Sequence, residues 1–412
     1  MTDAPGGVDR PALARAVAVD PVLFAEAYWG RRPLLTRAGE LAGPGAFTGL
    51  LSRDAVDELL SERGLRTPFL RVADRGNVLP ASAFTGGGGP GAEVGDQVVD
   101  DKVMRLYADG ATLVLQGLHR IWPPLTDYTR RLGAELRQPV QANAYLTPAG
   151  SQGFATHYDT HDVFVLQVDG SKRWRIHEPV LADPLECQGW GARADEVGAV
   201  AEGPPALDAV LAPGDALYLP RGWLHSAQTR DGSSLHLTLG VRAPTRYALV
   251  EELLNLAARD RRLRASLPFG LDVADPAAVG PELERTVEAL RDWLRTVDPA
   301  EVAGRLRERA WPAERPAPVR PLAQLDFAER LGADDRITVR DGLRWRLHDD
   351  GPEHVVLRLT GRTLRFPAYC AAAVRAALEP GPHRVGDLPG LDDADRLVLA
   401  RRLLREALAV AA

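Results

Sequence analysis

Between residues 140 and 242 the chain repeats a short pattern that limits the folds open to it. Apolar runs of five to seven residues alternate with turn signals such as Asp169-Gly170 and Pro213-Gly214. Short strands at this spacing are typical of a β-sandwich or a β-barrel. The predicted strands, in which residues two apart share a face, are Val163–Val168, Lys172–His177, Asp215–Leu219 and Leu235–Val241.

The flanking regions are mostly helical in pattern. Phe24–Leu35 predicts the end of an amphipathic helix that stops at Pro33, and long amphipathic patterns follow the barrel at Tyr247–Ala265 and Pro281–Asp298. Arg309–Pro321 carries four prolines and predicts a stiff linker. Further predicted elements are helices at 101–108 and 127–137 and strands at 111–115, 343–348 and 355–359.

We therefore predict an α+β chain in four parts. Residues 1–245 form a barrel domain with an N-terminal helical part, and residues 246–308 form a helical region whose apolar face pairs with a second copy. Residues 309–321 are the linker, and residues 322–412 form a winged-helix-like domain. The expected assembly is a homodimer.

Composition and charge argue against several classes of protein. The 412 residues carry a net charge of -6, which argues against a protein that mainly coats nucleic acid, and no apolar run is long enough to span a membrane. The start of the chain lacks the basic and apolar stretches of a signal peptide, so Cys187 and Cys370 are expected to be reduced thiols in a cytoplasmic protein. From Val319 to Ala412, 15 arginines nearly balance 14 acidic residues, so no DNA-binding role is expected there.

One histidine and one carboxylate stand two residues apart at the start of the barrel pattern. On a strand, His157 and Asp159 would point to the same side, and His225 follows later after a turn, a strand and another turn. Two histidines and one carboxylate on one face of a metal leave the opposite positions open, as in non-haem Fe(II) oxygenases. A lone His-x-Asp is common without a metal, but the later histidine makes a metal site the more specific interpretation.

Lys172 is one of only two lysines among 50 basic residues. On its strand it shares a face with Trp174 and Ile176, which would direct it into the barrel. A buried ammonium needs an anion, and the far carboxylate of 2-oxoglutarate would supply one. The alternative is a solvated lysine just after the Asp169-Gly170 turn.

Four further polar side chains lie near these residues in the pattern. Asn143 and Tyr145 are two apart on a predicted strand, and the tyrosine hydroxyl could donate to the carboxylate held by Lys172. His161 continues the period of the His-x-Asp pair and would approach the metal or the substrate unless the strand bulges there. His236 lies opposite a row of leucines, and we interpret it as structural.

These segments resemble the JmjC-type cupin oxygenases. The runs HYDTHDVFVLQVDGSKRW and LAPGDALYLPRGWLHSA are similar to barrel motifs of that family, and FAEAYWGRRPLL resembles the opening of its ribosomal oxygenase branch. The resemblance implies a double-stranded β-helix, a helical dimerisation region and a C-terminal winged helix. It implies Fe(II) and 2-oxoglutarate as cofactors and a histidine or arginine of a ribosomal protein as substrate. The implied iron ligands are His157, Asp159 and His225, and the implied cosubstrate-binding residues are Lys172, Tyr145 and Asn143.

The motifs leave the substrate open, and three alternatives remain. The same chemistry applied to a methyl carbon would make an N-methyl-lysine demethylase, which releases formaldehyde. A non-enzymatic metal cupin could instead report 2-oxoglutarate or oxygen to a DNA-binding winged helix, although no strongly basic recognition helix is visible. A cupin with another reaction, such as isomerisation, is disfavoured by Lys172 on the inner face.

Overall fold

The computed structural model describes residues 10–74, 76–151, 154–229, 232–310 and 315–412. Its internal contacts divide the chain into two units, Met1–Ala243 and Pro244–Ala412. The predicted linker includes residues 311–314, and the predicted first domain includes residues 1–9; both stretches lie outside the described residues. The finer division into four parts stays a prediction.

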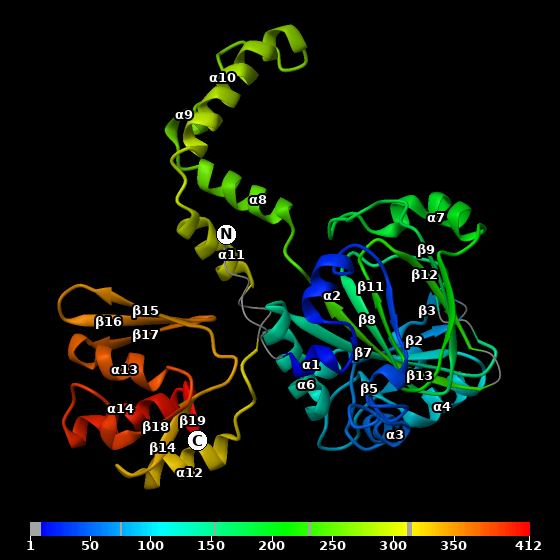
Figure 1. Ribbon diagram of the computed structural model, residues 1–412, viewed down its shortest axis with the longest axis horizontal. Coiled ribbons are helices and arrows are strands. Elements are labelled where there is room, and N and C mark those ends of the chain that lie inside the picture. The colour runs from blue at the N-terminus through cyan, green and yellow to red at the C-terminus, as the bar shows by residue number, and fades with distance from the viewer. Residues whose placement is uncertain (1–9, 75, 152–153, 230–231, 311–314) are drawn as a thin grey trace. The chain divides into compact units, whose positions relative to one another are not determined.

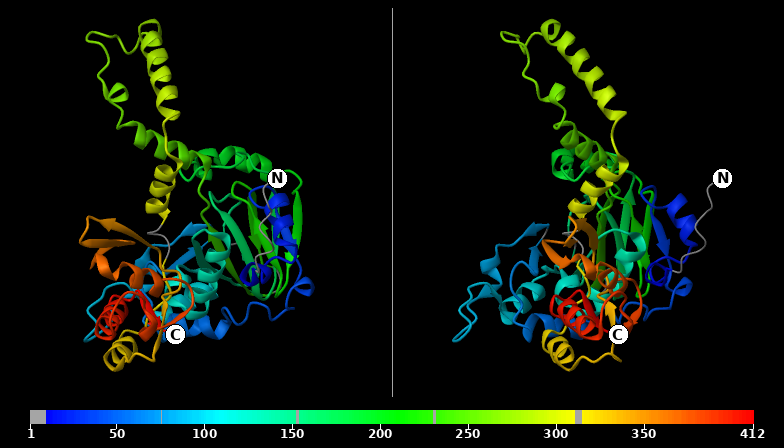
Figure 2. Two further views of the ribbon diagram at one scale, coloured as in Figure 1. Left: turned by 60° about the vertical axis from the view of Figure 1, so that its left-hand side comes forward. Right: turned by 90° about the vertical axis from the view of Figure 1, so that its left-hand side faces the viewer.

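The first unit is built on two β-sheets that face each other (Figures 1 and 2). The larger sheet has the strand order β1-β11-β8-β13-β7-β6-β2-β3, and the smaller has the order β10-β9-β12. The strands are β1 Leu34–Thr36, β2 Leu70–Asp74, β3 Asn77–Val78, β6 Thr112–Leu115, β7 Val140–Thr147, β8 Asp162–Asp169, β9 Lys172–His177, β10 Leu207–Leu211, β11 Ala216–Leu219, β12 Leu224–Gln228 and β13 Ser234–Val241, with a separate pair β4 Thr85–Gly86 and β5 Gln97–Val98. The four strands predicted at 163–168, 172–177, 215–219 and 235–241 are confirmed as β8, β9, β11 and β13.

Strand β8 is buried on both faces in the middle of the larger sheet. Val163 and Val165 join the apolar core that includes Trp174 of the facing sheet, whereas Phe164 and Leu166 belong to the core beneath the N-terminal helices. This explains why β8 reads as a continuous apolar run instead of an alternating one. The inward face, which carries the valines, is the one that meets β9.

The tight turn between β8 and β9 requires glycine. Gly170 has a φ of +62°, and a Cβ at this position would lie 1.9 Å from the carbonyl oxygen of Ser233. Only glycine accepts both this conformation and this close approach. The predicted Asp169-Gly170 turn is therefore confirmed, and it fixes where Lys172 enters β9.

Helices of the N-terminal region pack on the outer face of the larger sheet. They are α1 Pro11–Ala14, α2 Pro21–Ala27, α3 Arg53–Ser61, α4 Asp100–Ala108, α5 Leu118–Ile121 and α6 Pro123–Leu136; α7 Ala194–Ala201 lies in the connection between β9 and β10. Helices predicted at 101–108 and 127–137 and the strand predicted at 111–115 are confirmed as α4, α6 and β6. The helix predicted to run to Pro33 is wrong in extent: α2 ends at Ala27, because Leu34–Thr36 instead pairs with the open edge of β11.

The second unit begins with four helices: α8 Arg246–Ala257, α9 Arg261–Arg264, α10 Pro276–Leu294 and α11 Pro299–Ala310. The helix predicted over 247–265 is broken, because the Asp260 carboxylate accepts the backbone N–H of Arg262 and caps a new start. The second predicted helix starts earlier, at Pro276, and contains Pro281. Helix α11 is tied to α8 by an Arg305–Glu252 ion pair of 3.0 Å.

The remainder of the second unit has a core of its own. Its elements are α12 Pro321–Arg330, β14 Arg336–Val339, β15 Trp345–Asp350, β16 His354–Leu359, β17 Arg362–Pro367, α13 Ala371–Ala377, β18 Pro382–Arg384, α14 Asp393–Arg405 and β19 Ala409–Ala411. Two three-stranded sheets, β18-β14-β19 and β15-β16-β17, accompany the helices. Strands predicted at 343–348 and 355–359 are confirmed as β15 and β16. In the part of the chain that the structure describes, no helix has the length and apolar character needed to cross a membrane.

Candidate metal centre and its pocket

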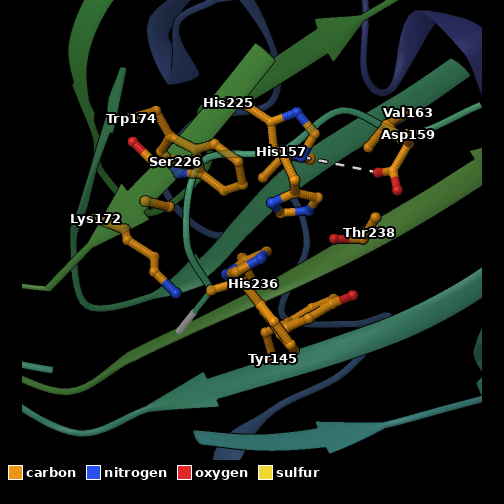
Figure 3. A pocket seen from close by; sticks show the side chains of 13 residues that line it. Tyr145, His157, Asp159, Val163, Lys172, Trp174, His225, Ser226, His236 and Thr238 are labelled. Carbon is orange, nitrogen blue, oxygen red and sulfur yellow. Dashed lines mark ion pairs between the residues drawn. The ribbon is translucent and has the colours of Figure 1, made fainter. Parts of the chain in front are cut away.

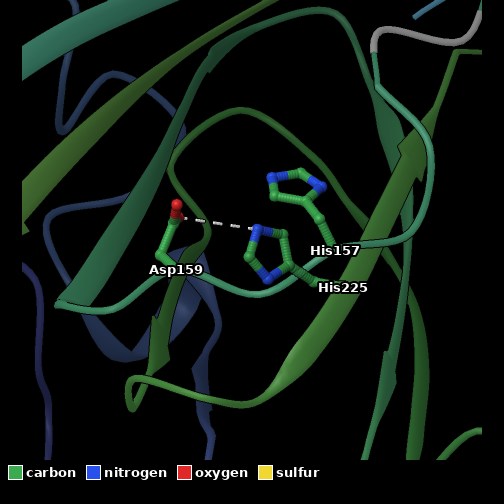
Figure 4. A group of neighbouring side chains, drawn as sticks. All are labelled: His157, Asp159 and His225. Atoms are coloured by element: carbon green, nitrogen blue, oxygen red, sulfur yellow. Dashed lines mark ion pairs between the residues drawn. The ribbon is translucent and has the colours of Figure 1, made fainter. Parts of the chain in front are cut away.

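Three side chains from distant parts of the sequence gather around one point beside β12 (Figure 4). His225 is the second residue of β12, and His157 and Asp159 come from the segment that leads into β8. One donor atom from each residue lies within 4.8 Å of the other two. The Nε2 atom of His225 is 3.8 Å from an Asp159 carboxylate oxygen. The structure thus brings all three predicted ligands together.

The prediction that His157 and Asp159 share a regular strand is wrong. Strand β8 begins only at Asp162, and His157 forms an isolated antiparallel bridge with His225. The two backbones exchange hydrogen bonds of 3.2 and 2.8 Å, and Gly222 N–H donates to the carbonyl of Asp159 at 2.9 Å. A single bridging residue is too little for a continuous strand, yet these bonds hold the ligand segments side by side.

Both histidine rings are oriented by the backbone behind them. The Nδ1 atom of His157 lies 2.7 Å from the carbonyl oxygen of Ala155, and that of His225 lies 3.1 Å from the carbonyl oxygen of Trp223. An Nδ1–H donated to a carbonyl leaves Nε2 as the free lone pair, which is how metal-binding histidines are usually held. The donor set and its orientation therefore fit a divalent metal ion.

Electrostatics favour the protonation states that a metal requires. Burial lowers the pKa of His225 to about 4, assisted by the neighbouring His157, so its imidazole is neutral at neutral pH. Burial acts to raise the pKa of Asp159, but His225, His161 and His157 together hold this pKa below its ordinary value. A neutral imidazole beside an ionised carboxylate is the state that binds a metal.

A pocket of about 560 Å³, counting its open mouth, adjoins these ligands (Figure 3). Its walls are formed by Tyr145, Phe154, His157, Asp159, Val163, Val165, Lys172, Trp174, His225, Ser226, Ala227, His236 and Thr238. Such a concave space with a few convergent polar groups is typical of a small-molecule site.

Lys172 reaches into this pocket from β9, as predicted from its strand face. It is 3% exposed, and its ammonium donates a 2.9 Å hydrogen bond to the Thr147 hydroxyl. Among the described residues, no ion pair of Lys172 with a carboxylate is found. Burial therefore lowers the pKa of Lys172 to about 7. An ammonium buried without a counterion is costly, so the pocket is suited to an anion.

Tyr145 and Asn143 lie on β7 but have different surroundings. Tyr145 lines the pocket, where burial raises its pKa to about 12 with help from the charge of Asp159. The amide oxygen of Asn143 accepts the backbone N–H of Gly117 at 3.0 Å, and Asn143 is absent from the described residues that line the pocket. The structure therefore brings Tyr145, but not Asn143, to the predicted site.

His161 and His236, whose roles the sequence did not establish, also differ in position. His161 packs against Gly240, where a Cβ would lie 2.7 Å from the imidazole, and it does not line the pocket. His236 does line the pocket, with its ring stacked on that of Tyr145 at a centroid distance of 5.0 Å. The sequence placed His236 opposite a row of leucines, where we interpreted it as structural, and gave no sign of these neighbours.

One feature beside the metal centre was missed from the sequence. The long connection at 178–206 carries Trp190, whose ring centroid is 6.3 Å from that of His157. The same connection is tied to the end of β13 by an ion pair between Glu186 and Arg242. Trp190 stands in the run Gln-Gly-Trp-Gly, and an aromatic residue among glycines in a long loop was the available signal.

Comparison with protein families identifies the class of this fold and site. Residues 124–249 match the JmjC domain model. This stretch runs from α6 through both sheets to α8 and contains all three candidate ligands. This part of the chain is therefore similar to a JmjC domain, and it contains strands of both facing sheets of the first unit.

Particular relatives carry more specific names. The bifunctional lysine-specific demethylase and histidyl-hydroxylase NO66 of Drosophila persimilis is 40% identical over 173 residues, covering 39% of this chain and 24% of that protein. Ribosomal oxygenase 1 of Gallus gallus is 29% identical over 302 residues, covering 70% of this chain and 48% of that protein. The chain thus spans less than half the length of either relative.

A similar fold occurs in a solved structure that spans nearly the whole chain. YcfD, a ribosomal oxygenase from Escherichia coli in complex with cobalt and 2-oxoglutarate, matches with a TM-score of 0.50. The alignment covers 96% of this chain and 98% of that chain at 18% sequence identity. This likeness establishes the fold.

Proposed function

We propose that this chain is an Fe(II)- and 2-oxoglutarate-dependent oxygenase that hydroxylates a protein side chain. One observation carries the proposal: three convergent donor atoms and a buried, unpaired ammonium open into the same pocket. Two imidazoles and one carboxylate suit Fe(II) with open positions. A metal alone would leave Lys172 without a counterion, whereas a dicarboxylate that reaches from the metal to Lys172 accounts for both features.

In this proposal His157, Asp159 and His225 hold the iron, and Lys172 holds the far carboxylate of 2-oxoglutarate. When bound, the two groups supply an oxidation by dioxygen that converts the keto acid to succinate and CO₂ and inserts one oxygen atom into a substrate C–H bond. The chain contributes orientation and exclusion of water. Phe154 closes the pocket between Tyr145 and His157, with ring centroids 6.2 and 6.1 Å away.

Asn143 supports the site from behind in this proposal. Its hydrogen bond to Gly117 fixes β7 against the segment that follows β6. Tyr145, two residues further along the same strand, then presents its ring to the pocket. Asn143 would therefore act on cosubstrate binding through the position of Tyr145.

The proposed substrate is a histidine or arginine side chain of a ribosomal protein. The names histidyl-hydroxylase and ribosomal oxygenase among the relatives support it. We further propose that the protein acts in the cytoplasm and that it forms a homodimer through the helices of residues 246–308. We also propose that residues 322–412 form a winged-helix-like domain that does not bind nucleic acid. Exposed apolar side chains on these helices, such as Leu254 and Leu283, support the dimer.

Lysine demethylation is a second candidate, since the NO66 relative is also named a lysine-specific demethylase. It uses the same site and differs in the product. Oxygen insertion at an N-methyl carbon gives an unstable adduct that releases formaldehyde, whereas side-chain hydroxylation leaves a stable gain of one oxygen atom.

Mass spectrometry distinguishes these outcomes. The purified chain is incubated with Fe(II), 2-oxoglutarate and ribosomes from the same organism, and His157→Ala is the matched control. Gain of one oxygen atom on one ribosomal histidine or arginine, absent with the variant, supports hydroxylation. Formaldehyde with loss of a methyl group supports demethylation. A chain that binds neither Fe(II) nor 2-oxoglutarate refutes the oxygenase proposal.

A further inference from the structure

His236 is a buried polar residue for which the proposed function has no role. It lies on β13, is 3% exposed, and lines the pocket. Its Nδ1 atom is buried without a hydrogen-bond partner among the described residues. Buried polar atoms are nearly always paired, so an unpaired nitrogen in a pocket wall points to a ligand that completes it.

The ring of His236 is held rigidly by two aromatic neighbours. It stacks on Tyr145 with an interplanar angle of 1°, and it meets Trp174 edge to face at 5.3 Å and 81°. These contacts come from β7 and β9, on opposite sides of the barrel. Packing of this kind leaves the imidazole little freedom to turn, so its nitrogens have fixed directions in the pocket.

Lys172 is the charged neighbour of this ring. Burial, and after it the charge of Lys172, holds the pKa of His236 well below its ordinary value. Figure 3 shows the His236 ring between Lys172 and Tyr145. The imidazole is therefore neutral at neutral pH, with one N–H donor and one acceptor nitrogen.

Tyr145 is placed differently, although the sequence suggested that its hydroxyl would help Lys172. The charges that act on the pKa of Tyr145 are those of Asp159 and Arg71. In Figure 3 the Tyr145 hydroxyl points to the side away from Lys172. Among these two stacked rings, His236 is the one that faces the ammonium.

We infer that His236 is a second cosubstrate-binding residue, whose imidazole N–H donates to the carboxylate that Lys172 holds. This inference rests on the proposed function. A carboxylate has two oxygens and about four lone-pair sites, more than the three N–H donors of one ammonium can satisfy. The Lys172 ammonium also gives one of its hydrogen bonds to Thr147. A neutral imidazole adds a donor without adding a second buried cation.

Binding of 2-oxoglutarate to the Mn(II)-loaded protein tests this inference without turnover. His236→Phe keeps a flat ring for stacking but removes both nitrogens, and His236→Gln restores an N–H donor. The loss of one hydrogen bond in a buried site predicts a roughly tenfold rise in the Kd for 2-oxoglutarate with phenylalanine and a smaller rise with glutamine. The Kd for Mn(II) stays unchanged in both variants, because neither touches the candidate ligands.

His177→Phe is the matched control. His177 is also 3% exposed and also has an unpartnered Nδ1, but it is absent from the residues that line the pocket. Its substitution leaves the Kd for 2-oxoglutarate unchanged. Equal losses at both positions would mean that burying phenylalanine disturbs the barrel, and would overturn the specific role of His236.

A second measurement needs no variant and so does not depend on whether a variant folds. Nitrogen NMR of the Zn(II)-loaded wild-type protein follows the imidazole signals during a 2-oxoglutarate titration. The His236 nitrogen signals shift at saturation and the His177 signals do not. Saturation with no change at His236 overturns the inference.

The outcomes separate this inference from the proposed function. A wild-type protein that does not bind 2-oxoglutarate overturns both. If the wild type binds, Lys172→Met weakens binding and His236→Phe does not, then His236 is structural and the oxygenase proposal stands.

Discussion

The two units of this chain differ in how many polar side chains they bury and in where their exposed apolar side chains gather. Among the described residues, fifteen polar or charged side chains are buried, and all but Glu252 belong to the first unit. Burying a polar group costs free energy unless it is paired. The first unit nevertheless buries Lys172 without a counterion and leaves a nitrogen of His236 unpaired. Its interior is thus arranged for something other than stability.

The second unit leaves apolar groups outside instead. None of the 19 residues of α10 is buried, and Leu283 on that helix is 59% exposed. Leu254 on α8 is 56% exposed. Apolar residues gathered on a helix surface are typical of protein interfaces. The contrast supports the proposed site in the interior of the first unit and the proposed interface on the surface of the second.

The largest effect is expected from removing a candidate ligand. Asp159→Ala takes away the only carboxylate of the three convergent side chains. Because losing even an outer partner of a metal ligand costs about 10–100-fold in affinity, we expect Fe(II) affinity and turnover to fall more than about 100-fold. Glu252→Ala, which removes the buried carboxylate of the second unit, is the control. Metal titration of both variants measures the effect. Equal metal affinity for Asp159→Ala and the wild type would show that Asp159 is not a metal ligand.

The next-largest effect is expected at Lys172. Its buried charge should lower the stability of the ligand-free protein and should contribute to binding of 2-oxoglutarate. The folded-state pKa of about 7 lies below the ordinary value of 10.5, so the unfolded chain binds more protons between these pH values. Stability of the ligand-free protein therefore rises with pH across this window, and the penalty is complete below pH 7. The groups that face the ammonium are the Thr147 hydroxyl on β7 and the His236 ring on β13.

Lys172→Met removes that charge at similar volume. We expect the Kd for 2-oxoglutarate to rise about 10–100-fold, since a charged hydrogen bond is lost. We also expect the ligand-free variant to be more stable than the wild type at pH 6.5, with an advantage that shrinks by pH 9. Urea unfolding at both pH values measures this. A variant that is less stable at pH 6.5 would show that the ammonium is already well compensated in the fold.

The third effect belongs to the surface of the second unit. Leu283→Arg places a charge on the exposed face of α10, and a charge buried in an apolar interface without a partner is costly. We expect the dimer dissociation constant to rise at least about tenfold, while the Kd for 2-oxoglutarate stays the same. Glu284→Arg, on the same helix, controls for the added charge. Sedimentation equilibrium measures both variants, and a wild type that is monomeric at every concentration contradicts the interface.

The sequence predicted features of the interior that depend on residue type and spacing within one segment better than features that depend on contacts between distant segments. The face of Lys172 needed only the alternation of one strand. His157 and Asp159 were found by their spacing, but a bridge to the distant His225 holds them in place and not the predicted strand. The partners of His236 and Leu34–Thr36 depend on register between distant strands: His236 lies opposite Tyr145, and Leu34 lies opposite Tyr218. The pattern of a single strand does not show which residues of another strand lie opposite it. The stacking of His236 on Tyr145 and the pairing of β1 with β11 were therefore not predictable. The break at Asp260 was also missed, because a cap competes with an amphipathic pattern that continues past it.

Trp190 is a large aromatic residue of the first unit that is 38% exposed, so it could act at the surface and not in the interior. It lies beside the ring of His157, one of the candidate metal ligands. Its connection at 178–206 is acidic, with one arginine and six carboxylates at Glu178, Asp183, Glu186, Asp195, Glu196 and Glu202. An exposed indole in acidic surroundings suits a cationic side chain on its way to the metal.

We therefore expect Trp190→Ala to raise the KM for a basic protein substrate about three- to tenfold, because one aromatic contact is worth about 0.5–1.5 kcal/mol. The Kd values for metal and 2-oxoglutarate should not change, since Trp190 does not line the pocket. Val200→Ala is the control, because Val200 is equally exposed on α7 of the same connection. An unchanged KM would mean that the substrate approaches the candidate metal centre without contacting Trp190. A weaker Kd for 2-oxoglutarate would instead mean that Trp190 holds His157 in place, and that even this exposed aromatic residue acts on the interior of the first unit.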